Sequence, residues 1–216
     1  MKRISMASTK TSEMGRRRVR AGALCAALAA AFALAAVAEA GSPRALIQRT
    51  IDEVLAILRD SKKSDTQRRP ELEAIARDRF DFETMSRLVL AANWKKLTPS
   101  QQTEFVDEFT RFLANDYGSR IERYEQEQVE ITGERAEARG DFTIKTKIIG
   151  GKNNGALVDY RMRQKDGSWK IIDVVIEGIS LVANYRDQFR EVAGSGGPAV
   201  VIEKLKEKNA AAPKPS

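Results

Sequence analysis

Two hydrophobic periods divide this chain. Apolar residues recur at helical spacing from about residue 43 to 124, and they alternate with polar residues from about 129 to 176. Helical spacing then returns from about residue 179 to 209. Strands joined by short turns pair antiparallel, and a sheet with one apolar and one charged face is covered by helices on one side. We therefore predict an α+β fold with several helices packed on one face of a twisted antiparallel sheet.

Four helices are predicted before the strands. Pro43 is typical of a first helical position, whereas the polar stretch 61–69 indicates a surface connection and Pro70 is a candidate start for the second helix. Thr98 and Gln101 have the spacing of a capping box. The predicted helices cover residues 43 to about 58, 70–80, 82–93 and 98 to about 124.

Short strands and two further helices follow. Alternation predicts strands around 129–131, at 142–148, at 158–163 and at 169–176, with loops at 150–155 and 165–168. Both residue parities of 169–176 are apolar, so the sequence does not decide which face of this strand is buried. The predicted C-terminal helices cover about 179–192 and 198–209, with a glycine-rich break at 194–197. We expect one domain over residues 41–209 and a disordered tail over 210–216.

The first forty residues have the three parts of a secretory signal peptide. A basic region precedes the Ala- and Leu-rich run 21–37, and Ala38 and Ala40 are the small residues of a cleavage site after Ala40. The apolar run, about 17 residues, is short for a membrane-spanning helix, so we expect cleavage rather than retention as an anchor. Cleavage would also remove the single cysteine, Cys25, with the signal peptide. An exported chain without disulfides is typical of the bacterial periplasm, which is the location we predict.

Removal of this segment changes the charge argument. The whole chain has 37 Lys and Arg against 30 Asp and Glu, a net charge of +7. Residues 1–40 hold seven of the bases and two of the acids, so the mature chain carries +2. Overall charge therefore gives no support to a nucleic-acid-binding function.

The composition also restricts the chemistry. The chain has no histidine, and Cys25 lies in the predicted signal peptide, so the usual transition-metal ligands and His-based catalytic sites are absent. We expect no metal and no cofactor, and an enzyme would have to use carboxylates, lysines, tyrosines or hydroxyls. The remaining candidates for acid–base chemistry are Asp159, Asp173 and Glu177. Asp173 follows two isoleucines, where burial would raise the pKa of its carboxyl. We favour structural roles instead, with Asp173 capping a backbone group or pairing with an arginine and Glu177 marking a junction.

Basic and aromatic side chains allow two interpretations. Six arginines are surface charges unless they gather at a cavity mouth, where they would meet an anionic head group: Arg77, Arg79, Arg87, Arg161, Arg163 and Arg186. Four aromatics on the fourth predicted helix, namely Phe105, Phe109, Phe112 and Tyr117, belong to a core or line a pocket. The same residues line both, so the sequence leaves a packed interior and a ligand pocket open.

Three segments resemble the toluene-tolerance family, the periplasmic phospholipid-binding component of the Mla ABC transport system. They are residues 81–90 with Trp94, the pattern from Gln101 to Tyr117, and the stretch from Val158 to Arg186. The resemblance extends in the same order from about residue 43 to 209. It departs at Ala91-Ala92, where many members have a glycine after the Val-Leu pair, and this places the local backbone in question.

The resemblance implies an apolar cavity between helices and sheet that holds the acyl tails of a phospholipid. It also implies a shuttle between an outer-membrane lipoprotein complex and an inner-membrane ABC transporter complex, which maintains outer-membrane lipid asymmetry. Relatives associated with hopanoid synthesis make another lipid an alternative cargo. The residues expected to line the cavity are Met85, Leu88, Val89, Phe109, Phe112, Leu113, Val129, Phe142, Ile144, Val158, Tyr160, Val174, Ile176, Leu181 and Tyr185.

Two other functions compete with a lipid carrier. A small isomerase- or dehydratase-like enzyme with a cone-shaped pocket would expose the Asp173 carboxylate to that pocket. A periplasmic chaperone or adaptor would have a solid core and an exposed apolar patch. Shelter of acyl chains needs an apolar surface and no catalytic group, which agrees with the absence of a sharp polar motif.

Overall fold

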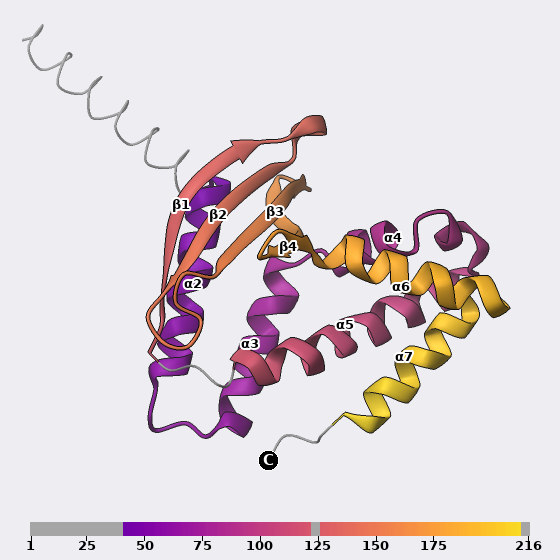
Figure 1. Ribbon diagram of the computed structural model, residues 1–216, viewed down its shortest axis with the longest axis horizontal. Coiled ribbons are helices and arrows are strands. Elements are labelled where there is room, and N and C mark those ends of the chain that lie inside the picture. The colour runs from indigo at the N-terminus through magenta and orange to yellow at the C-terminus, as the bar shows by residue number, and fades with distance from the viewer. Residues whose placement is uncertain (1–40, 122–125, 213–216) are drawn as a thin grey trace, which may run out of the picture. The chain divides into compact units, whose positions relative to one another are not determined.

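The computed structural model describes residues 41–121 and 126–212 (Figure 1). The predicted signal peptide, Cys25 and the last four residues lie outside this part of the chain. The fourth predicted helix is described as far as Ile121. The helices are α2 (Pro43–Arg59), α3 (Asp65–Arg79), α4 (Phe82–Leu90), the 3₁₀ helix η1 (Ala91–Lys96), α5 (Pro99–Ile121), α6 (Leu181–Gly196) and α7 (Ala199–Ala211).

Five antiparallel strands form one sheet in the order β1-β2-β3-β4-β5. Helices from both halves of the chain pack with the apolar face of this sheet into one hydrophobic cluster. The opposite face carries charged side chains, which confirms the predicted α+β fold. The strands are β1 (Gln128–Ala136), β2 (Phe142–Ile149), β3 (Leu157–Lys165), β4 (Ser168–Ile176) and β5 (Ile179–Ser180), and a short 3₁₀ turn, η2 (Ala138–Gly140), joins the first two.

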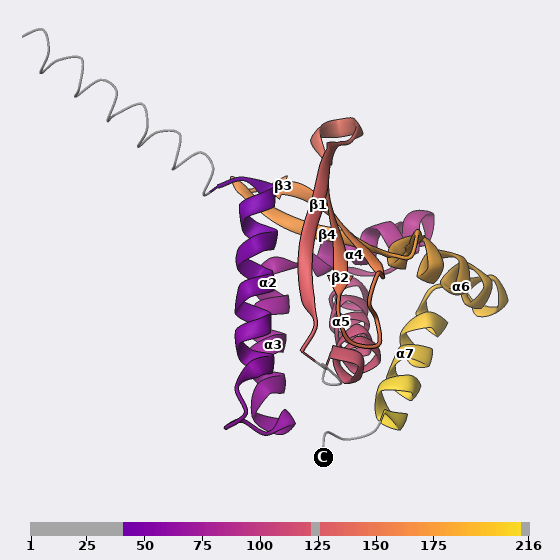
Figure 2. The same cartoon turned by 60° about the vertical axis from the view of Figure 1, so that its left-hand side comes forward.

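The helices form two groups around the sheet. α2 packs against α3 and also contacts β1 and β2, whereas α6 packs against both α4 and α7. Figures 1 and 2 both place α7 away from α2, with α5 between them. The first helix therefore covers the β1 end of the sheet, and the C-terminal helices extend the core beyond it.

The start of α3 differs from the prediction. The helix begins at Asp65 rather than Pro70, and Pro70 lies inside it. Ser64 is the N-cap, and its backbone N–H donates to Oε1 of Gln67 at 2.9 Å. A serine followed three residues later by glutamine is a capping-box signal, and it lies within the stretch predicted to be a surface connection. Pro70 is the sixth residue of α3, beyond the first turn, so it lacks the backbone N–H that would donate to the Thr66 carbonyl.

The end of α4 also differs from the prediction. The α-helix stops at Leu90 instead of continuing to Asn93, and residues 91–96 form the 3₁₀ helix η1. Ala91 has φ 50° and ψ −121°, a conformation that an α-helix does not contain and that favours glycine. The resemblance placed the backbone at Ala91 in question, and an alanine in this conformation has a local backbone cost.

The C-terminal helices are longer than predicted. Residues 179–180 form the edge strand β5, and α6 then continues through Gly194 to Gly196. Gly197, with φ 84°, ends α6, and its N–H donates to the Ala193 carbonyl over 2.8 Å. Only the last glycine of the predicted break therefore stops the helix, because it alone takes the left-handed conformation. α7 ends at Ala211, two residues into the predicted tail.

A bulge in β4 decides which of its residues face the core. Arg161 of β3 pairs with Asp173, whereas the next residue, Met162, pairs with Ile171, so Ile172 is an extra residue in β4. The extra residue reverses the alternation. Trp169 and Ile171 before the bulge therefore share the apolar cluster with Val174 and Ile176 after it, which explains why both parities are apolar.

Candidate functional site

The residues predicted to line a lipid cavity all belong to one apolar cluster. The structure brings them together from α4, α5, α6 and four strands. Eight are buried: Met85, Val89, Phe109, Leu113, Ile144, Val174, Leu181 and Tyr185. Seven are half-buried: Leu88, Phe112, Val129, Phe142, Val158, Tyr160 and Ile176. Their contact with lipid stays a prediction. Burial is most complete among the helices and least complete along one edge of the sheet face, although Leu88 and Phe112 are half-buried helical residues and Ile144 and Val174 are buried strand residues.

The more completely buried part of the cluster lies among the helices. Five aromatic rings of α5 and α6 contact one another with centroids 5.4–6.0 Å apart: Phe105, Phe109, Phe112, Tyr185 and Phe189. Edge-to-face pairs predominate, which is the favoured packing of aromatic rings. α7 adds Val201, Ile202 and Leu205, none more than 2% exposed. This part of the cluster is a filled core.

The less completely buried part of the cluster lies on the sheet. Strand pairing aligns Ile131, Thr146, Val158 and Ile176 in one row across four strands. The Thr146 hydroxyl donates to the Val158 carbonyl over 2.5 Å, so the row presents no unpaired polar atom there. Three of these side chains keep solvent-accessible surface, although they face the same side as the buried core. We call Ile131, Thr146, Val158 and Ile176 the apolar row.

Tyr160 lies in the adjacent row, between Ile144 and Val174. Burial raises the pKa of its phenol to about 12, with no charged neighbour contributing. The side chain nevertheless keeps some accessible surface, and its hydroxyl has no hydrogen-bond partner among the described residues. The phenol is therefore desolvated although only half-buried, and it faces the same side of the sheet as the apolar row.

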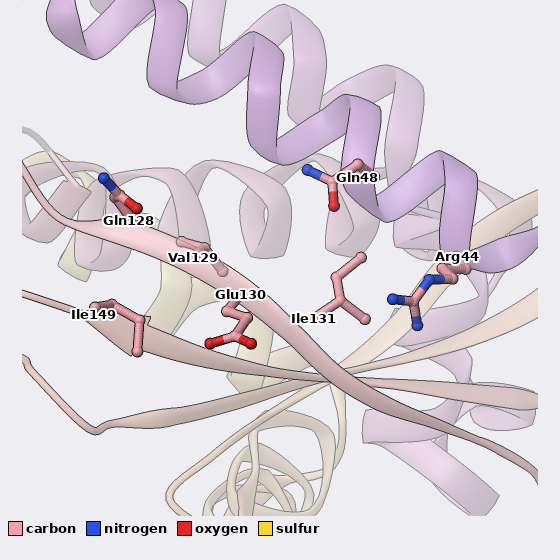
Figure 3. A pocket seen from close by; sticks show the side chains of 7 residues that line it. All are labelled: Arg44, Gln48, Gln128, Val129, Glu130, Ile131 and Ile149. Carbon is pink, nitrogen blue, oxygen red and sulfur yellow. The ribbon is translucent and has the colours of Figure 1, made fainter.

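An open cleft leads to one end of the apolar row. It has a volume of about 540 Å³ and lies between α2 and β1 (Figure 3). Figure 3 shows Ile131 directed toward α2 and Glu130 directed away from it. Arg44 and Gln48 of α2 form the opposite wall. Ile131 thus belongs to both the cleft and the apolar row. The next member of the row, Thr146, is fully buried, so in this structure the cleft meets the row at Ile131 alone.

This cleft was only partly foreseen from sequence. Of its seven lining residues, Val129 alone was among the predicted lipid contacts. The other six were not: Arg44, Gln48, Gln128, Glu130, Ile131 and Ile149. Ile131 has the parity of Val129 and was recoverable from alternation. The α2 residues were not recoverable, because nothing in the helical period tells which strand a helix lies on. The expected enclosed apolar cavity stays a prediction, since this cleft is open and has a mixed lining.

The candidate catalytic carboxylates do not converge on a site. The Asp173 carboxylate accepts hydrogen bonds from the Ser180 hydroxyl at 2.5 Å and from the Val182 N–H at 3.1 Å. It thereby caps the N-terminus of α6, the structural role that we favoured. Asp159 lies on the charged face of the sheet, opposite Val158 and Tyr160. Glu177 precedes Gly178 in the β4–β5 turn, with positive φ at both residues.

The six arginines singled out from sequence form no cluster at the cleft. Arg161 and Arg163 bind Asp141 on the charged face of the sheet. Arg79 pairs with Glu53, and Arg186 donates to the Leu88 carbonyl over 2.8 Å. The remaining two are Arg87, which pairs with Glu83 and lies over the Trp94 ring, and the exposed Arg77. None of the six lines the cleft.

Within the described ranges, no group of three or more His, Cys, Asp or Glu side chains is placed to hold a metal ion. In the same part of the chain, no helix combines the length and the hydrophobicity that crossing a membrane requires.

Comparison with known proteins identifies the family. The profile of the MlaC protein family matches residues 48–207. The chain belongs to the MlaC family. The toluene tolerance protein ttg2D of Pseudomonas putida is 29% identical over 178 residues, which cover 79% of this chain and 81% of the relative. The MlaC of Haemophilus influenzae, an intermembrane phospholipid transport system binding protein, is 22% identical over 180 residues, with 80% and 84% covered.

A solved structure has the same fold as this MlaC family member. The phospholipid-binding protein of Ralstonia solanacearum, determined in complex with a phospholipid, superposes with a TM-score of 0.72 at 25% identity. The match covers 79% of this chain and 98% of the other. The predicted resemblance to the toluene-tolerance family is thereby confirmed.

Proposed function

We propose that this protein is a periplasmic carrier that binds phospholipid acyl chains and moves lipid between membrane complexes. The proposed partners are an outer-membrane lipoprotein complex and an inner-membrane ABC transporter complex. The proposed mature form begins after Ala40, carries no cofactor and has no catalytic activity. Membership of the MlaC family and the phospholipid bound to a structural relative support the lipid ligand.

The observation that carries this proposal is the half-open apolar row. Val158 and Ile176 belong to the hydrophobic cluster and yet keep accessible surface. The row continues into the α2–β1 cleft at Ile131. An apolar surface that stays accessible inside a folded domain is costly unless a ligand covers it. An acyl chain lying along the row would remove this surface from water.

The energetics define what such a carrier must supply. Exposure of acyl chains to water costs about 0.8 kcal/mol per methylene, which for two chains of fifteen is roughly 24 kcal/mol. This cost keeps a free phospholipid in its membrane. A carrier has to offset most of it with apolar contacts, and needs only enough accessible surface to accept and release the chains.

Lipid extraction tests the proposal directly. Mature protein purified from the periplasm, extracted with organic solvent and analysed by mass spectrometry, is expected to yield phospholipid in stoichiometric amount. Recovery of a hopanoid would show that the cargo is not a phospholipid, and the carrier function would still stand. Protein that carries no lipid and does not take up added lipid would refute the proposal. Sequencing of the mature N-terminus in the same preparation tests cleavage after Ala40.

A pair of variants on adjacent residues tests the apolar row. Val158→Trp fills the surface along which we place the acyl chain, whereas Leu157→Trp adds the same ring to the opposite face, where Leu157 is 49% exposed. We expect Val158→Trp to remain folded and exported with strongly reduced lipid content. Leu157→Trp should retain wild-type lipid content, and equal lipid loss in both variants would exclude this row as the binding surface.

A further inference from the structure

Arg44 is the arginine that lies at the cleft. It occupies the second position of α2 and is exposed, and its guanidinium lies beside Ile131, between α2 and β1 (Figure 3). No carboxylate pairs with it among the residues that the structure describes. By contrast, Arg79, Arg161 and Arg163 all have carboxylate partners. A guanidinium has five N–H donors and is always charged, so an unpaired one beside an apolar surface is available to an anion.

The surroundings of Arg44 separate polar from apolar groups. The side-chain amides of Gln48 and Gln128 lie along the cleft, and Val129 and Ile131 form its apolar floor. Gln48 donates one amide hydrogen to Asp52, at 3.0 Å, which orients its side chain on α2. The nearest acid of the lining, Glu130, is directed away from α2 (Figure 3). Donors therefore border the opening, and Ile131 of the apolar row lies on the floor of the cleft.

The change from polar donors to aliphatic side chains along the cleft matches the head-group end of an amphiphile. A phospholipid presents a phosphate next to two ester-linked hydrocarbon chains, in the order in which the cleft presents a guanidinium and then aliphatic side chains. Arginine and phosphate form charge-assisted hydrogen bonds, which are about twice as strong as neutral ones. Neutral lipids offer only ester and hydroxyl groups at the same place.

We propose that the α2–β1 cleft is the head-group end of the lipid site, where the Arg44 guanidinium binds the phosphate of the phospholipid while an acyl chain follows the apolar row from Ile131. This inference rests on the proposed carrier function. It adds that the protein selects phosphate-bearing lipids over neutral lipids with the same chains.

Calorimetric titration of the delipidated mature protein with two short-chain lipids tests this selection. Dioctanoyl phosphatidylglycerol and dioctanoylglycerol have the same acyl chains, and only the first has a phosphate. We expect wild-type protein to bind the phosphate-bearing lipid more tightly. Arg44→Gln should weaken its binding about tenfold, as loss of one charge-assisted contact predicts, and leave dioctanoylglycerol binding unchanged. Arg44→Lys should recover part of the loss, because it restores the charge without the planar fork.

The controls separate this inference from its alternatives. Arg190→Gln removes the same charge from α6, where the Arg190 side chain is 68% exposed and pairs with Asp187, and it should leave both affinities unchanged. Equal weakening of both lipids by Arg44→Gln, or no weakening, would overturn the head-group assignment. Glycerol phosphate binding as tightly as the intact lipid would also overturn it, since the cleft would then be a site for free phosphate esters. Failure of wild-type protein to bind either lipid would instead refute the carrier function itself.

Discussion

The helical end and the sheet face of this protein have similar apolar side chains and differ in how completely they are covered. Around Phe109, aromatic rings from α5 and α6 fill the space between helices, and Phe109 is 1% exposed. On the sheet, Val158 and Ile176 face the same cluster and remain half-buried. The helical end therefore has the packing of a core that maintains the fold, whereas the sheet face provides the surface that we propose for the ligand.

Truncation of Phe109 should give the largest effect on stability. We expect Phe109→Ala to lower the free energy of unfolding by about 4 kcal/mol, because a fully buried ring is replaced by a cavity. Val158→Ala in the apolar row should cost only about 1 kcal/mol, since water or lipid already reaches that side chain. Urea denaturation of the delipidated proteins measures both. Equal costs would contradict the distinction between a filled core and an open face.

A substitution of Asp141, on the charged face of the sheet, should have an intermediate effect on stability. Asp141 is fully buried and accepts hydrogen bonds from Arg161 and Arg163 at 2.7–2.9 Å. Burial opposes its charge, but the hydrogen bonds and positive charges of Arg163 and Arg161 outweigh burial and hold the pKa of Asp141 below its usual value. We expect Asp141→Asn to lower the free energy of unfolding by about 2 kcal/mol at pH 7. Loss of a fully buried ion pair would cost more, because here both arginines are partly solvated.

The same variant tests the sign of this pH dependence. Because the folded-state pKa of Asp141 is depressed, its contribution is present above the unfolded-state pKa, near pH 4, and is lost as the pH falls through the lower folded-state pKa. The difference in unfolding free energy between wild type and Asp141→Asn should therefore shrink below about pH 4. A difference that stays constant from pH 7 to the acid limit would show that the carboxylate charge is not what matters.

The smallest expected effect is a gain at the α4–η1 junction. Ala91 has φ 50°, and glycine takes this conformation without the steric cost of a Cβ. We expect Ala91→Gly to stabilise the protein by about 1 kcal/mol, which corresponds to about 3 °C in thermal unfolding. Ala92→Gly is the matched control, because Ala92 is exposed and has an ordinary φ. It should be neutral or slightly destabilising, and a gain from both substitutions would remove backbone strain as the explanation.

Much of the fold was predictable because its signals are local. The Thr98 cap, the Asp166-Gly167 turn and the alternation of β2 and β3 each depend on residues a few positions apart. Errors arose where a second local signal competed with the first. Pro70 concealed the earlier Ser64 cap, and the first glycines after Val192 were given the role that Gly197 performs through its positive φ.

The site was less predictable than the fold because it depends on contacts between distant segments. The predicted lining residues do form one cluster, since each lies on an apolar face of its own element. Their division into a filled core and an open row follows from how closely helices approach the sheet, which periodicity does not encode. Arg44 was missed for the same reason, because the sequence does not show that the first turn of α2 lies across from β1.

Hydrophobic period, caps and turns determined the α+β class and the order of the four long strands from sequence alone, because each of these depends on short-range patterns. Three sequence segments separately carried the resemblance to the toluene-tolerance family. Only the tertiary structure decided that the β4 bulge turns Trp169 and Val174 to the same face, that Asp173 caps α6, and that an open cleft beside Arg44 joins the apolar row. The reason is physical: side-chain facing and exposure depend on register and on inter-element packing, and both are fixed only when segments far apart in the chain meet.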